Sequence, residues 1–80
     1  MALHYFHCTD GADLIVDRHG RETAGPGDLR RRAGSVAAEV MAAVPAYDEW
    51  ENWSVHVYDE RGQVAIVPFP PRLARMLKAA

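Results

Sequence analysis

Three residues of the sequence, His7, Cys8 and His56, carry side chains that bind soft or borderline metal ions. Such a site needs three or four ligands within about 2.0 to 2.3 Å of one ion. In an extended strand His4 and His7 lie on opposite faces because their spacing is odd, whereas His4 and Cys8 share a face. His56 could join either set, depending on which strands are neighbours. A metal-dependent function is therefore one interpretation, but the pattern favours partly buried, hydrogen-bonded histidines. We expect no bound metal or other cofactor.

Cys8 beside His7 or His56 also has the ingredients of a cysteine nucleophile and its general base. No Asn or Asp can be assigned to orient the histidine, and no helix N-terminus is placed to lower the pKa of the thiol. A buried cysteine acting as a small apolar residue is the simpler expectation. The sequence also has two pairs of neighbouring carboxylates, Asp10 with Asp13 and Glu49 with Glu51. These pairs are typical of a turn and of a solvated loop, so we predict no catalytic residues and no enzymatic activity.

The strongest local charge is a run of three arginines, Arg30, Arg31 and Arg32. One interpretation is a solvated helix face paired with a neighbouring carboxylate such as Glu22 or Asp28. The other is an anion or nucleic-acid patch, extended by the basic residues between positions 72 and 78. The net charge of −2 argues against general polyanion binding, and the arginines lack the interleaved aromatic residues of a single-strand binder. A nucleic-acid-binding module is therefore the alternative.

These residues must be positioned by a helix that the apolar periodicity predicts from Asp28 to Val44. Its apolar stripe recurs in steps of three and four residues, with these members: Leu29, Ala33, Val36, Val40 and Val44. Asp28 is predicted to be the N-cap, and Pro45 to end the helix. Charges at both ends oppose the helix dipole, because the arginines follow its start and Asp48, Glu49 and Glu51 follow its end. Complementary charge on a partner would offset this placement.

Two Asp-x-x-Gly segments, Asp17–Gly20 and Asp59–Gly62, interrupt apolar runs and predict the turns of two β-hairpins. The first turn would join a short strand at 14–17 to another at 21–23, after a first strand at Leu3–Cys8.

The second turn fixes a register if residues 60–62 form its loop and Asp59 faces Gln63. One face of that hairpin is then apolar, with these pairs: Val57 with Ala65, Val55 with Val67, and Trp53 with Phe69. We expect this face to pack against Leu29, Val36, Val40 and Val44 of the helix. The other face pairs Tyr58 with Val64, His56 with Ile66, and Ser54 with Pro68, and is more apolar than a freely solvated face.

Length and composition are those of one small globular domain. The chain has 80 residues, of which 49% are hydrophobic and 25% charged. Its single cysteine cannot form an internal disulfide, which favours a cytoplasmic location. We identify no signal peptide and no apolar stretch of membrane length, and therefore expect no membrane partner.

Several of these segments together resemble a widespread family of small uncharacterised bacterial proteins. The resemblance rests on the strand His4–His7, the following Asp10-Gly11, the Asp17–Gly20 turn, Asp28-Leu29 at the helix start, and Trp53–Val57 before Asp59–Gly62. The first strand of that family typically reads Tyr-Phe-Phe-His before Asp-Gly, and here His4 and Tyr5 stand in the first two places. The resemblance implies an α+β fold and no known activity.

We predict an α+β domain over residues 1–80, with a small antiparallel sheet packed on one amphipathic helix in the order β-β-α-β-β. The tail, residues 72–80, is predicted to be a short helix or flexible. We interpret the domain as a non-catalytic protein-interaction module that forms a homodimer or binds another protein. The predicted contact residues are His56, Tyr58, Val64 and Ile66, with the three arginines attracted to the loop Asp48–Glu51 of a second copy. The competing outcome is a monomer whose tail covers the same sheet face.

Overall fold

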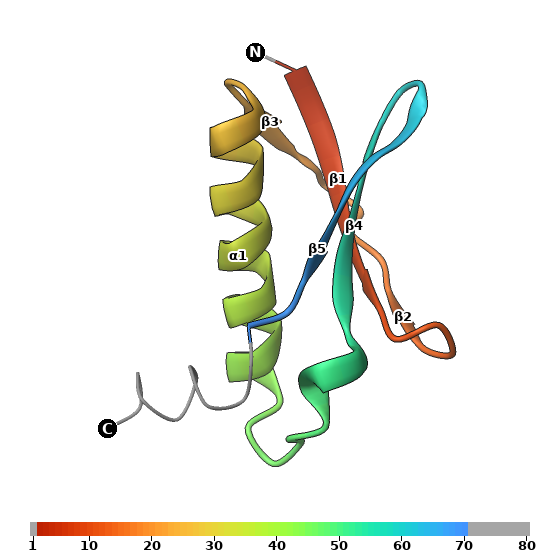
Figure 1. Ribbon diagram of the computed structural model, residues 1–80, viewed down its shortest axis with the longest axis vertical. Helices are drawn as coiled ribbons and strands as arrows, with labels where there is room; N and C mark the ends of the chain where they lie inside the picture. The colour runs from red at the N-terminus through yellow and green to blue at the C-terminus, as the bar shows by residue number, and fades with distance from the viewer. Residues whose placement is uncertain (1, 71–80) are drawn as a thin grey trace.

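One helix packs against one face of a five-stranded antiparallel sheet (Figure 1). The computed structural model describes residues 2–70, so the predicted tail at 72–80 lies outside the described residues. The elements in chain order are β1 (Ala2–Thr9), β2 (Leu14–Ile15), β3 (Arg21–Thr23), α1 (Pro26–Ala43), the 3-10 turn η1 (Trp50–Asn52), β4 (Ser54–Asp59) and β5 (Gly62–Pro68). The α+β fold class is confirmed, and the second strand of the predicted order is divided into β2 and β3.

Strand β1 lies inside the sheet and pairs along both of its edges. On one edge it pairs with β4, which in turn pairs with β5. On its other edge β2 pairs with the end of β1 and β3 with its beginning, so that Cys8 is opposite Ile15 and His4 is opposite Arg21. The segment from β2 to β3 therefore runs antiparallel to β1 as one interrupted edge strand.

The prediction that Asp17–Gly20 turns a hairpin is wrong, because β2 and β3 pair with β1. The local turn chemistry is nevertheless present: Asp17 Oδ1 accepts the N–H groups of His19 and Gly20, each at 3.0 Å, and Gly20 has a φ of 75°. Asp17 Oδ2 accepts the N–H of Phe6 at 3.1 Å. The carboxylate thus takes the place of a main-chain acceptor where the edge strand is interrupted. Strands of two and three residues would be weak partners for each other, whereas the eight-residue β1 can pair with both.

The β4–β5 hairpin has the predicted register away from its turn. Val55 is opposite Val67, and Val57 is opposite Ala65. Near the turn the prediction is wrong, because Tyr58 is opposite Gln63 and Asp59 opposite Gly62, with a bulge after Val57. The bulge leaves Val64 as the extra residue of β5. Gly62 takes a φ of 127°, which strongly favours glycine at this position.

Helix α1 begins two residues before Asp28, with Gly25 as its N-cap. The prediction of Asp28 as the N-cap is therefore wrong. Its carboxylate accepts the N–H of Ala24 at 2.8 Å. Asp28 therefore still stabilises the start of the helix, but from within its first turn. The helix ends at Ala43, two residues before Pro45. Within the described residues, no helix is both long and apolar enough to cross a membrane.

The core lies between α1 and the inner face of the sheet. Its buried hydrophobic residues are Phe6, Cys8, Ala33, Ala37, Trp50, Trp53, Val55, Val57 and Phe69. Leu29, Val36 and Val40 pack against this core while partly exposed, as does Val67. The predicted core position of Val44 is wrong, because it caps the helix C-terminus and is 45% exposed. Ala33 and Ala37 are instead fully buried, since their small side chains let the helix approach the sheet.

Candidate functional site

The structure divides the predicted metal ligands between the two faces of the sheet. His7 is directly opposite His56 in the β1–β4 ladder, and both lie on the face away from α1. Cys8 lies on the opposite face, in the core. The N–H of Asp17 donates to His7 Nδ1 at 3.0 Å, and His56 Nδ1 hydrogen-bonds Gln63 Oε1 at 2.9 Å. Among residues 2–70, no group of three or more His, Cys, Asp or Glu side chains is arranged to hold a metal ion.

Cys8 is buried and in its protonated form. Its side chain is 1% exposed, and burial, with a smaller effect of the Asp17 carboxylate, raises the pKa of the thiol to about 11. We expect native protein at pH 8 to react with a thiol reagent at least a hundredfold more slowly than unfolded protein, because only the exposed thiolate is a nucleophile. Timed alkylation in buffer and in denaturant measures this ratio. Equal rates in both solvents would contradict the placement of Cys8.

The arginine run is partly neutralised within the chain. Asp28 forms ion pairs with Arg31 and with Arg32, the latter at 3.4 Å. Hydrogen bonding from the Ala24 N–H and the two arginines hold the pKa of the Asp28 carboxyl below its ordinary value. The predicted pairing of the run with Asp28 is thus confirmed for two of the three residues. Arg30 is exposed and makes no ion pair within residues 2–70.

The sheet face away from α1 carries aromatic and histidine side chains. Tyr58 lies 5.4 Å from His7 between ring centroids, and Tyr5 stacks on His7 at 6.4 Å. The predicted contact residues Val64 and Ile66, both on β5, are 46% and 51% exposed, and both also line a cavity beside the first turns of α1. His56 is opposite Ile66, as predicted, but Tyr58 is opposite Gln63 and not Val64, so the predicted pairing of the contact residues is wrong at Val64.

The two outer edges of the sheet differ in their protection. The edge formed by β2 and β3 consists of two short strands separated by the Asp17–Gly20 loop. Strand β5 forms the other edge with seven residues and no charged side chain. The N–H of Phe69 donates to the carbonyl oxygen of Trp53, so the main-chain groups of Phe69 point toward the β4 side. Because these groups alternate in direction along an antiparallel strand, those of Ile66 and Pro68 point outward, away from β4. Proline has no N–H to offer an outer edge, which leaves Val64 and Ile66 as the open part.

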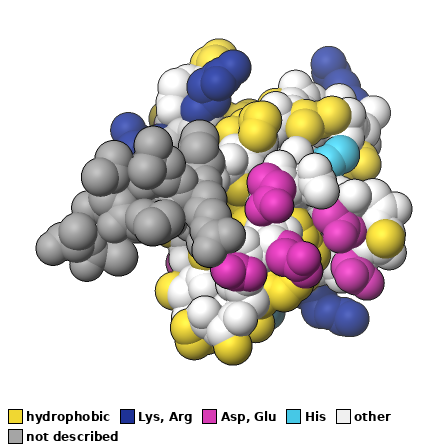
Figure 2. All heavy atoms as spheres, turned by 60° about the horizontal axis from the view of Figure 1, so that its bottom comes forward, with side chains coloured by type: hydrophobic (Ala, Val, Ile, Leu, Met, Phe, Trp, Pro, Cys, Tyr) yellow, Lys and Arg dark blue, Asp and Glu magenta, His cyan; other side chains and the backbone are white. Residues whose placement is uncertain are grey.

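Charge is separated along the axis of α1. The arginines lie in its first turns, and the loop after its C-terminus carries Asp48, Glu49 and Glu51. Figure 2 shows acidic side chains gathered at the end of the molecule that is lowest in Figure 1.

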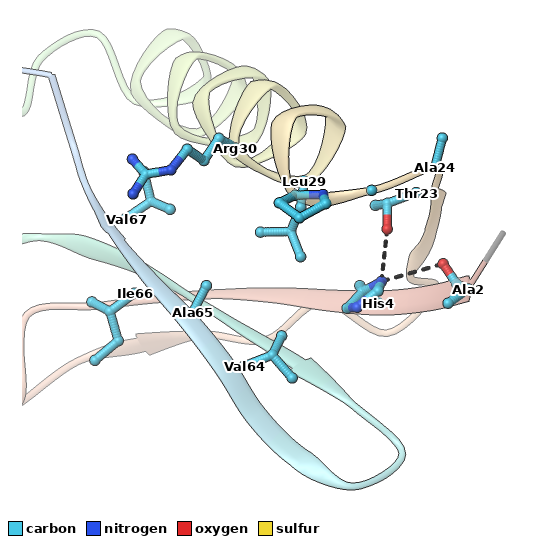
Figure 3. A pocket seen from close by; sticks show the side chains of 12 residues that line it. Ala2, His4, Thr23, Ala24, Leu29, Arg30, Val64, Ala65, Ile66 and Val67 are labelled. Carbon is cyan, nitrogen blue, oxygen red and sulfur yellow. Dashed lines mark hydrogen bonds between the residues drawn. The ribbon is translucent and has the colours of Figure 1, made fainter.

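A cavity of about 570 Å³ lies between the first turns of α1 and strand β5. Figure 3 shows Leu29 and Arg30 on its helix side, Val64 and Ala65 on its sheet side, and His4 at its floor. The sequence patterns do not predict this cavity. The hydrogen bond between His4 and Thr23 at its floor could be expected only if the pairing of β3 with β1 were known.

A family described as a domain of unknown function (DUF6894) matches residues 3–70. Nothing among curated proteins or solved structures matches the chain. The matched segment contains every helix and strand described above except the first residue of β1. The chain therefore belongs to the DUF6894 family, an uncharacterised domain family.

Proposed function

We propose that the domain is a non-catalytic protein-interaction module that self-associates through β5. The observation that carries this proposal is the contrast between the two sheet edges. An edge strand presents unpaired N–H and C=O groups, and proteins protect such edges with short strands, charges and irregularities. All three devices occur along β2 and β3, where Asp17, Arg18 and Arg21 lie. Within residues 2–70, β5 is neither short nor charged along Val64–Ile66, and the bulge at Val64 is its irregularity there.

A second copy is the occupant that fits this edge best. Antiparallel pairing of β5 with its own copy satisfies outward main-chain groups reciprocally, since a two-fold axis makes each contact occur twice. The axis would be perpendicular to the sheet, so both helices would lie on one face and run in opposite directions. Because the first turns of α1 lie beside Val64–Val67, the arginine-bearing starts of the two helices would lie on either side of this axis and not beside the acidic loops. The proposal therefore assigns the association to main-chain pairing of β5 and not to the charged helix ends.

Substitution of the exposed edge residue tests the proposal. We expect the parent protein at micromolar concentration to have twice the mass of one chain by light scattering. Ile66→Lys should restore the single-chain mass, because a lysine would enter the interface twice. Ile66 is 51% exposed, so the fold should tolerate the change.

Val16→Lys is the matched control. Val16 is 48% exposed and lies beside the protected edge, and this variant should keep the dimer mass. A monomeric parent, or an Ile66→Lys variant as dimeric as Val16→Lys, would refute the proposal. Loss of the dimer only at high salt would assign the association to the charged helix ends and not to β5.

A further inference from the structure

The buried imidazole of His4 lines the cavity between α1 and β5 with one nitrogen unused. His4 is 9% exposed, and its Nδ1 contacts Thr23 Oγ1 at 2.9 Å and the carbonyl oxygen of Ala2 at 3.2 Å. The carbonyl contact suits the tautomer with its proton on Nδ1, which leaves Nε2 as an acceptor. Nε2 has no hydrogen-bond partner within residues 2–70. A buried polar atom without a partner is uncommon and needs an explanation.

The cavity also has a cation that no carboxylate of residues 2–70 neutralises. Asp28 is occupied by Arg31, Arg32 and the N–H of Ala24. Arg30 has no such partner in the part of the chain described and extends from α1 over Val67 (Figure 3). Its guanidinium can bind a carboxylate through two parallel hydrogen bonds. The positive end of the α1 dipole lies at the same end of the cavity and also favours an anion.

The rest of the lining is apolar and has the dimensions of a small-molecule site. Leu29 of α1 faces Val64 and Ala65 of β5 across the cavity, and Pro26 also lines it. Its volume of about 570 Å³ lies within the range of about 300 to 1,000 Å³ found for ligand pockets. An apolar wall with a few polar groups is typical of such sites.

We propose that this cavity binds a small amphipathic carboxylate. The carboxylate binds Arg30, the apolar body lies between Leu29 and the side chains of Val64 and Ala65, and a hydroxyl on the ligand donates to His4 Nε2. The proposal does not depend on self-association, because every group that it uses belongs to one chain.

Titration of ¹⁵N-labelled protein with three probes tests the site, using octanoate, 8-hydroxyoctanoate and 1-octanol. We expect progressive shifts in the amide signals of Leu29, Ala65 and Val67. Octanoate should bind about tenfold more tightly than 1-octanol, because an ionic hydrogen bond is gained. Binding of 8-hydroxyoctanoate should be tighter than that of octanoate if its hydroxyl reaches His4.

Arg30→Gln and Arg31→Gln form a matched pair, since both remove one exposed arginine from the same turn. Only Arg30→Gln should abolish the preference for octanoate over 1-octanol, because Arg31 does not line the cavity. Equal octanoate affinity in the two variants, or equal binding of octanoate and 1-octanol by the parent, would overturn the carboxylate site. Unshifted amides in the lining residues would overturn the cavity as a binding site. An 8-hydroxyoctanoate affinity no greater than that of octanoate would overturn the role given to His4.

Discussion

Replacing Phe69 with alanine is expected to lower the free energy of unfolding by about 3 to 5 kcal/mol. Phe69 is 6% exposed, and its ring lies 5.5 Å from that of Trp50 and 6.0 Å from that of Trp53. Truncation removes a large apolar side chain from an aromatic cluster that closes one end of the core. A domain of this size has about 5 to 15 kcal/mol of stability, so the variant should unfold at a much lower urea concentration than the parent.

Urea unfolding followed by tryptophan fluorescence measures the effect, since both tryptophans lie in the same cluster. Val16→Ala serves as the control at an exposed position and should change stability by less than about 1 kcal/mol. A Phe69→Ala variant as stable as this control would contradict both the packing of Phe69 and the β4–β5 register that places it beside Trp53.

Removal of the Asp17 carboxylate by substitution with alanine is expected to cost about 2 to 3 kcal/mol. The side chain accepts three main-chain N–H groups, those of Phe6, His19 and Gly20. Loss of the hydrogen bond from the Phe6 N–H should account for most of this cost, because the interrupted edge strand provides no other acceptor at that position. Asp13→Ala, which removes a carboxylate from an exposed turn residue, should be nearly neutral by the same urea assay.

The pH dependence of stability provides an independent check on Asp17. Burial alone raises the pKa of this carboxyl, but the N–H groups of Gly20, Phe6 and His19, together with His7, outweigh it and lower the pKa overall. A lowered pKa in the folded state means that the contribution is present above the unfolded pKa of about 3.9 and is lost as pH falls through the folded value. The stability difference between parent and Asp17→Ala should therefore be greatest near neutral pH and shrink in acid. A difference that grows in acid would contradict these hydrogen bonds.

Local patterns predicted the helix and most of the C-terminal hairpin because the interactions concerned are close in sequence. The apolar stripe from Leu29 to Val40 and the inner-face pairs of Val55 and Val57 follow from periodicity and from one turn. The Asp17–Gly20 segment shows where this reasoning stops. Its side-chain bonds to His19 and Gly20 are the same in a hairpin and in an interrupted edge strand. Pairing with β1 decides between the two, and that choice depends on distant residues.

The candidate sites show the same division between local and tertiary information. The odd spacing of His4 and His7 correctly placed them on opposite faces, but the pairing of His7 with His56 required the order of the strands. The pairing of Asp28 with Arg31 and Arg32 could be anticipated from helical spacing. The cavity could not, because it is formed by segments far apart in sequence, from His4 on β1 to Val64 on β5.

The most direct test of the central claim, self-association through β5, is an isotope-filtered NOE experiment on an equimolar mixture of ¹³C,¹⁵N-labelled and unlabelled protein. Antiparallel pairing of β5 with its copy predicts intermolecular NOEs among the main-chain protons of Val64, Ala65 and Ile66, since facing strands lie about 5 Å apart. The same protons should give none in the Ile66→Lys variant. A dimeric sample whose intermolecular NOEs come from Tyr5, His7 and Tyr58 on the sheet face, with none from β5, would contradict the account.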